Sequence, residues 1–183
     1  NPKSGHLISF DQALPIISEN NEILNTFTFT KYKELNKDSE MIGRASLYLK
    51  AANTFDGSDV RISKRAIVPY NRLRGFEKGK VGPVDNNDYI GGNYVTAMTA
   101  STTLPDFLPD LDSVDFSLFL DAGNIWGVDY DSSLDNSKLR SSTGLSIDWL
   151  TPIGPLNFIF SQPITKSSTD VEETFRFDIG TTF

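Results

Sequence analysis

The residues that could carry out chemistry in this chain are few. Its 183 residues include no cysteine and a single histidine, His6. A zinc centre or a histidine-based catalytic triad therefore has little to build on. A barrel enzyme of the lipase type would need His6 beside a serine nucleophile, and the sequence contains no Gly-x-Ser-x-Gly elbow. Enzyme chemistry of this kind is disfavoured.

Two groups of aspartates carry oxygen ligands of the kind that calcium prefers. They are Asp106, Asp110 and Asp112, and Asp129, Asp131 and Asp135. The first group lacks the glycine and the terminal glutamate of an EF-hand, so a solvated turn is the better interpretation. The second is expected to be a solvated loop, with contacts to divalent ions at a lipopolysaccharide-covered surface as the alternative. Nearby glycines form no phosphate loop, because no Gly-Lys-Ser/Thr opens a helix. We predict no metal site.

The apolar residues that must position any site recur with a period of two, which is typical of strands. The last strand is the clearest case. One face carries Phe175, Phe177, Ile179, Thr181 and Phe183, and the other carries Arg176, Asp178, Gly180 and Thr182. The same alternation recurs around 42–51, 92–104, 112–121 and 139–149, and more weakly at 5–15, 22–34 and 154–163. The pattern predicts about eight strands, each near the length that crosses a bilayer when tilted.

The connections between these strands alternate in length. Short, turn-like segments are expected at 1–5, 34–40, 105–112 and 151–155, and longer polar ones at 126–138, 165–173 and 54–91. Long loops at one end and short turns at the other are typical of a bacterial outer-membrane barrel, with 16–21 as the exception. A soluble all-β sandwich also alternates. Charged residues in the middle of the polar faces and the terminal aromatic favour a barrel with a wet lumen.

Composition excludes some partners. The net charge is -7, which disfavours a nucleic acid or an anionic lipid surface as the main partner. No run approaches the roughly 18 apolar residues of a membrane helix. The first residues lack the apolar segment of a signal peptide, so we expect the chain to begin within a larger protein.

Several motifs fall in the order found in one known family. They are Arg72-Leu73-Arg74-Gly75-Phe76, Gly79-Lys80-Val81-Gly82-Pro83, Gly91-Gly92-Asn93, Phe119-Leu120-Asp121-Ala122-Gly123, the turn at Trp149–Leu156 and the final strand Phe175–Phe183. Together they resemble the BamA-type barrels of the surface-antigen, POTRA-barrel superfamily. The resemblance implies an all-β, antiparallel transmembrane β-barrel. Residues 1–183 would be its C-terminal part, the second half of sixteen strands, with the first half and the POTRA domains before Asn1.

The resemblance also implies a contact site inside the barrel. The loop at 54–91 would fold into the lumen, and its Arg74 would meet Asp121, because a guanidinium fork suits a carboxylate. Gly75 would allow a sharp turn, and Phe76 would anchor the loop tip on the inner wall. Gly123 completes the strand motif. The family's additional lumen glutamate corresponds to Ser101 here, so the pair with Asp121 is the expected contact. An exposed Arg74 bound to water is the alternative.

The function that the resemblance implies is the assembly and insertion of β-barrel proteins into the outer membrane. The last strand, 173–183, would form one side of a lateral gate, with Phe175, Phe177 and Ile179 toward lipid, Gly180 as a bending point and Phe183 ending the C-terminal signal. The expected partners are unfolded outer-membrane clients, outer-membrane lipids and accessory lipoproteins. No enzyme activity, cofactor or nucleic acid is expected. A two-partner secretion or translocation transporter and a passive porin are the alternatives.

Overall fold

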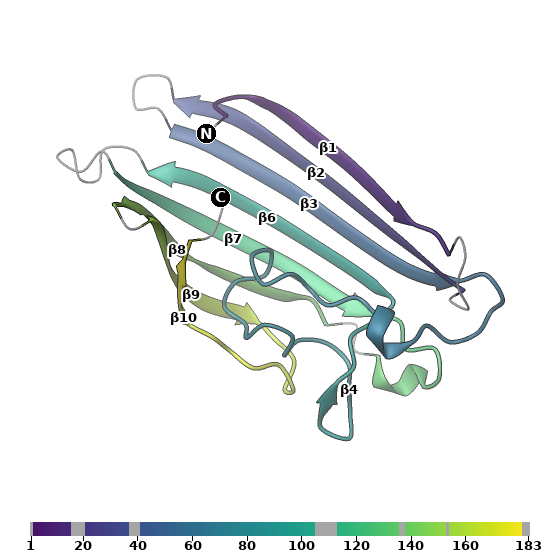
Figure 1. Cartoon of the computed structure of the whole chain (residues 1–183). Coiled ribbons are helices and arrows are strands. Elements are labelled where there is room, and N and C mark those ends of the chain that lie inside the picture. Colours follow the sequence, from purple (N-terminus) through teal and green to yellow (C-terminus); the bar gives the residue numbers. More distant parts are fainter. Residues whose placement is uncertain are drawn as a thin grey trace.

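The computed structural model describes residues 2–15, 21–36, 41–104, 113–135, 138–152 and 154–180. Within them, one antiparallel sheet has the strand order β1-β2-β3-β6-β7-β8-β9-β10. Its strands are β1 (Gly5–Ala13), β2 (Glu22–Asn36), β3 (Met41–Thr54), β6 (Tyr94–Leu104), β7 (Val114–Trp126), β8 (Arg140–Thr151), β9 (Gly154–Thr165) and β10 (Phe175–Ile179). The sheet is curved and open, with β1 and β10 at its two edges (Figure 1). The all-β, antiparallel fold predicted from the alternation is confirmed.

The remaining elements are short and lie in the long connections. They are β4 (Val84–Asp85), β5 (Asp88–Tyr89) and the 3-10 turns η1 (Ile62–Lys64) and η2 (Ser132–Leu134). The connection between β3 and β6 is the longest, and we call residues 55–93 the long loop. It lies over the concave side of the sheet (Figure 1). No helix in the described ranges is long and apolar enough to cross a membrane.

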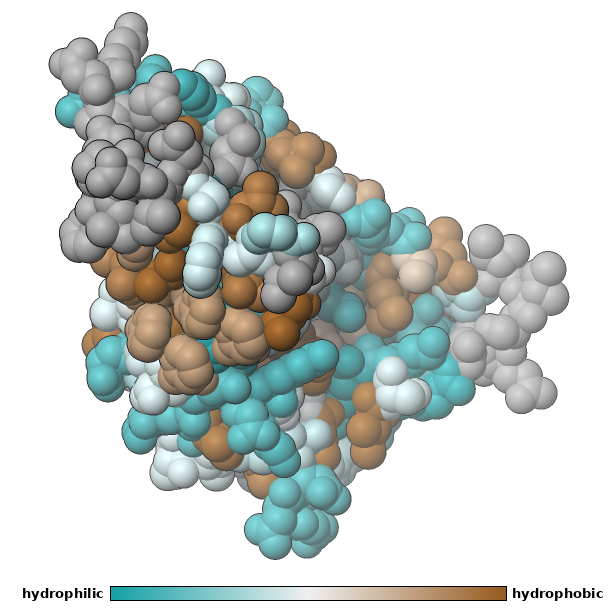
Figure 2. All heavy atoms as spheres, turned by 60° about the vertical axis from the view of Figure 1, so that its left-hand side comes forward, coloured by the Kyte–Doolittle hydropathy of each residue, from teal (hydrophilic) through white to brown (hydrophobic). Residues whose placement is uncertain are grey.

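The two faces of the sheet differ as the two-residue period requires. On β6, Val95 and Ala97 are buried on the concave face, whereas Met98, the residue after Ala97, is 55% exposed on the convex face. The large exposed apolar side chains of the C-terminal strands lie on the convex face as well, among them Leu118, Leu120, Phe160, Phe175, Phe177 and Ile179. Figure 2 shows such side chains gathered into an apolar patch bordered by hydrophilic ones. A soluble sandwich would bury this face, whereas a barrel turns it toward lipid.

The buried apolar core lies between the sheet and the long loop rather than between two sheets. It contains Ala66, Val68, Leu73, Phe76 and Val81 from the loop, and Val95, Ala97 and Ile125 from β6 and β7, with Tyr48 of β3 packed against it. Burial of these side chains stabilises the loop on the concave face at about 25 cal/mol per Å² of apolar surface. The loop is therefore packed against the concave face of the sheet.

The last strand differs from its expected bounds of 173–183. Within the described residues it covers Phe175–Ile179, because the residues before it pair with the long loop and Gly180 leaves the extended conformation with a φ of 72°. Thr181, Thr182 and Phe183 lie outside the described residues, as do the turns around 37–40 and 105–112 with Asp106, Asp110 and Asp112.

A charge placed on the convex face should be far more costly than one on the concave face. We expect Leu118→Lys to lower the free energy of unfolding by about 2–4 kcal/mol, because a lysine that faces the hydrocarbon of the bilayer is poorly solvated. Its neighbour Ser117 faces the other way, and Ser117→Lys should cost about 0.5 kcal/mol. Urea unfolding of the complete protein in lipid vesicles measures both. Equal losses would contradict the assignment of the faces.

Candidate functional site

Arg74 of the long loop and Asp121 of β7 form an ion pair on the concave face. Arg74 Nε lies 2.7 Å from Asp121 Oδ2, and its terminal nitrogen lies 2.8 Å from Oδ1. The backbone N–H of Arg74 donates to the same carboxylate at 3.0 Å. The side chain of Asp121 has no exposed surface, and that of Arg74 is 12% exposed. The geometry is the two-pronged fork that guanidinium groups make with carboxylates.

The strand residues around Asp121 shape a seat for the guanidinium group. Arg74 Cζ lies 3.5 Å from the centre of the Phe119 ring, which adds a cation–π contact. Phe119 in turn lies opposite Gly144 of β8, where a Cβ atom would come within 2.6 Å of the ring. The hydroxyl of Ser142 donates to the carbonyl of Arg74. Sequence reasoning missed Phe119, although it opens the motif that contains Asp121.

Gly75 and Phe76 continue the loop tip. Gly75 has a φ of 91°, in the left-handed region that glycine adopts without strain. Phe76 is 1% exposed, lies in the core against the wall and pairs with Glu172, just before β10. Gly123 lies further along β7, opposite Arg140, where a Cβ atom would approach the carbonyl oxygen of Thr96 to 3.0 Å. It helps the strands to pack and is not part of the Arg74 contact.

In the described part of the chain, Asp121 is the carboxylate that Arg74 contacts by hydrogen bonds, and Asp148 of β8 is near enough to interact with Arg74 electrostatically. Ser101, the position of the family's additional glutamate, lies opposite Phe119.

No group of acidic or histidine side chains in the described ranges is arranged to hold a metal ion. In the loop after β7, Asp131 accepts hydrogen bonds from the hydroxyl and the backbone N–H of Ser133, which lower the pKa of its carboxyl.

The predicted C-terminal residues lie away from this pair. Phe175 and Phe177 stack on Phe160 and Phe158 of β9, with ring centres 5.1 and 4.9 Å apart. Ile179 continues the same convex face and is exposed. Phe183, the expected end of the signal, is outside the described residues. The structure thus separates a site on the concave face from a lipid-facing row on the last strand.

A second buried ion pair was not predicted. Arg140 of β8 and Asp170 of the loop before β10 both have fully buried side chains, and Arg140 Nε lies 2.9 Å from Asp170 Oδ2. Arg140 also donates to the side chain of Asn124 at 2.6 Å. The alternation placed Arg140 on the polar face, but nothing in the spacing of a polar loop marks Asp170 as its partner.

Neutralising Asp121 should unseat the loop. Asp121→Asn keeps the shape and leaves the guanidinium group of Arg74 beside Phe119 without a counter-charge. We expect a loss of about 3–5 kcal/mol in the free energy of unfolding. Lys166→Ala, which removes an exposed ion pair with Glu172, should cost less than about 1 kcal/mol. Urea titration of the complete protein provides the comparison, and similar losses at both positions would show that Asp121 is not an anchor.

Alanine substitutions at two glycines of the loop distinguish the cost of backbone strain from the cost of steric crowding. Gly75→Ala forces a side chain into the left-handed region and brings its Cβ atom to 3.1 Å from that of Ser142. Gly79 has a φ of 74° but open space around it. We expect Gly79→Ala to cost about 1–2 kcal/mol and Gly75→Ala more. The stabilities of the two variants are ranked by the temperature at which the folded band shifts to the unfolded position in gel electrophoresis. A lower temperature for Gly79→Ala than for Gly75→Ala would mean that Gly75 is not packed against β8.

Comparisons with known proteins agree with this geometry. A family model described as the Omp85 superfamily domain matches residues 1–183. The outer membrane protein assembly factor BamA of Neisseria meningitidis is 31% identical over 61% of the chain, and that of Neorickettsia risticii is 31% identical over 75%. A SAM50-like protein of Schizosaccharomyces pombe is 31% identical over 61% of the chain. The chain spans 17%, 19% and 25% of the lengths of these proteins.

A solved structure is similar as well. The crystal structure of BamA from Haemophilus ducreyi lacking POTRA domains 1–3 superposes with a TM-score of 0.82 and 28% identity over 96% of this chain and 38% of that one. The predicted resemblance to BamA-type barrels and the predicted location in a bacterial outer membrane are confirmed. The chain belongs to the Omp85 superfamily.

Proposed function

We propose that the protein carrying this chain assembles β-barrel proteins and inserts them into the outer membrane. The observation that carries the proposal is the long loop, which is locked on the concave face by Arg74 and Asp121 in a chain of the Omp85 superfamily. Relatives similar to it are named outer membrane protein assembly factors. The work needs strand pairing and lipid contact rather than bond-making, so the proposal includes no enzyme activity and no cofactor.

The last strand is proposed as one side of a lateral gate. It pairs with β9 over Phe175–Ile179, and β10 is the shortest strand of the main sheet in the described ranges. The N–H of Ser161 donates to the carbonyl of Thr174, and that of Gly180 donates to the carbonyl of Pro155. This parity turns the backbone groups of alternate residues, such as Phe177, toward the open edge. Backbone groups that point away from β9 in this way can pair with a further strand.

Lipid contact at the gate is the second part of the proposal. Phe175, Phe177 and Ile179 are exposed on the convex face of a strand of five residues. A short apolar segment favours a locally thinned bilayer, which lowers the barrier to inserting a new strand beside it. Outer-membrane lipids and unfolded client barrels are therefore the proposed partners, together with accessory lipoproteins.

A transporter of the same superfamily is the remaining candidate from another class, since a lumen loop suits it equally. The names of the similar proteins favour assembly. A passive porin is less consistent with a loop packed against the inner wall, because that loop occupies space that an open pore would need.

Depletion of the complete protein distinguishes these functions. We expect unrelated β-barrel proteins to disappear from the outer membrane and to reappear on expression of the wild-type gene. Arg74→Ala should restore them poorly, whereas Arg61→Gln, in the same loop but outside the site, should restore them fully. The amounts of several barrels in isolated outer membranes are the measurement. Retention of all barrels with loss of one secreted protein would indicate a transporter, and a change in solute permeability alone would indicate a porin.

A further inference from the structure

The residues just before β10 are joined to the long loop by a short antiparallel ladder. The N–H of Glu77 donates to the carbonyl of Val171 at 2.9 Å, and that of Glu173 donates to the carbonyl of Gly75 at 3.0 Å. Phe76 and Glu172 form the bridge between these bonds. The N–H of Val171 donates to the carbonyl of Lys80 at 3.1 Å. Segments 75–80 and 171–173 thus hold each other as neighbouring strands do.

The ion pair of Arg140 and Asp170 holds the end of this ladder at which Val171 bonds to Lys80. Asp170 Oδ2 accepts from Arg140 and from the backbone N–H of Ser167 at 2.5 Å, and its Oδ1 accepts from the N–H of Gly82 at 3.4 Å. One carboxylate therefore touches β8, its own loop and the long loop. Because both side chains are fully buried, water cannot easily take the place of either partner if the other is removed.

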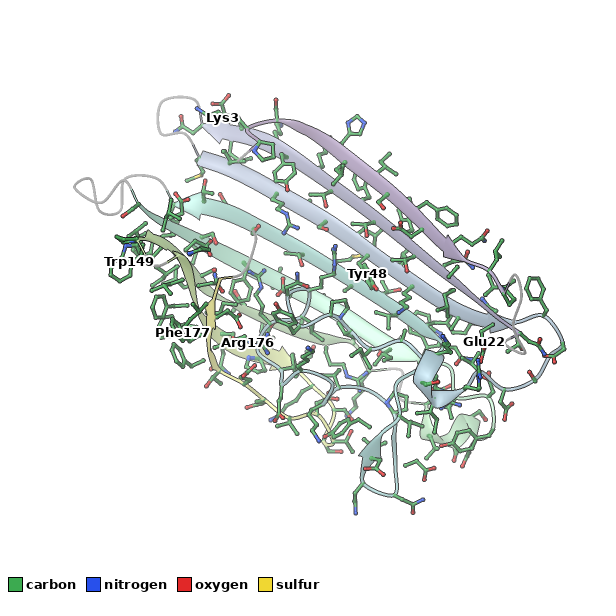
Figure 3. The ribbon with its side chains drawn as sticks, viewed as in Figure 1. Lys3, Glu22, Tyr48, Trp149, Arg176 and Phe177 are labelled. Atoms are coloured by element: carbon green, nitrogen blue, oxygen red, sulfur yellow. The ribbon has the colours of Figure 1, made fainter. Side chains whose placement is uncertain are left out.

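The inner end of the ladder is tied to β10 itself. Arg176, the second residue of β10, donates to the carbonyl of Phe76 at 3.1 Å and to Glu173 at 2.7 Å. Its guanidinium group also lies 4.9 Å from the ring centre of Tyr70, in the long loop. In Figure 3, Arg176 lies beside the long loop, whereas Phe177 projects from the other side of β10. The last strand holds the loop with one face and meets lipid with the other.

We infer that Asp170 and Arg140 are positioning residues that make the long loop and the last strand move as one body. The body has two buried anchors on the wall, Arg74 with Asp121 and Arg140 with Asp170. Displacing β10 from β9 pulls on the ladder, and through the ladder on the seat of Arg74. The role in gating rests on the proposed function, whereas the coupling itself is a property of the folded chain.

Hydrogen–deuterium exchange of the complete protein in detergent micelles tests the coupling without any client. With Asp170→Asn, we expect amide exchange to become about tenfold faster in 75–82 and in 175–179 together. Asp121→Asn, at the other anchor, should also speed exchange in 175–179, because coupling is reciprocal. Arg140→Lys keeps the charge but loses the fork, and it should give the same pattern at smaller amplitude if Asp170→Asn does not fold.

The matched control is Arg61→Gln. Arg61 lies near the start of the same loop, before the ladder segment 75–80, and pairs with Glu22 of β2. Its replacement should leave exchange in 175–179 unchanged. Faster exchange confined to 166–174 in Asp170→Asn would overturn the inference, since it would show a local brace. This result would leave the assembly function standing, and loss of that function in depletion experiments would leave the coupling standing.

Discussion

A carboxylate with no exposed surface on the concave face of β7 is the constraint on which the rest of this structure depends. Asp121 is fully buried there and needs a partner, because an unpaired buried charge costs several kcal/mol. The strand supplies no cation of its own, so the long loop must return to the wall and bring Arg74 to it. The Phe119 ring, which lies opposite Gly144, and the hydroxyl of Ser142 then define where the loop tip rests.

Seating the loop has consequences on both sides of the sheet. On the concave side, the apolar residues of the loop form a buried core with residues of β6 and β7, so the loop is packed against the sheet. At the other end of the loop, residues 75–80 pair with the residues before β10, which covers Phe175–Ile179 in the described part of the chain. The convex side keeps its apolar row toward lipid. The last strand is thus tied through the residues before it to a loop that two buried ion pairs hold against the sheet.

The period of two and the alternating loop lengths were enough to predict the strands and their faces, because each residue's side is fixed by the pleat. Spacing alone did not predict Arg74 with Asp121; the expectation came from a resemblance, since the partners are 47 positions apart. Arg140 with Asp170 was missed because nothing local distinguishes a buried loop aspartate from a solvated one. The start of β10 was expected at 173, directly after the polar connection, whereas in the structure Glu173 still bonds to the long loop and the strand begins at Phe175.

An experimental structure of the complete protein in lipid nanodiscs tests the central claim most directly. The density should place the Arg74 guanidinium group against both carboxylate oxygens of Asp121 within the lumen, with the convex side chains of β7 and β10 in lipid. A loop that projects outward, with Asp121 open to water or paired with a cation from elsewhere in the barrel, would contradict the account.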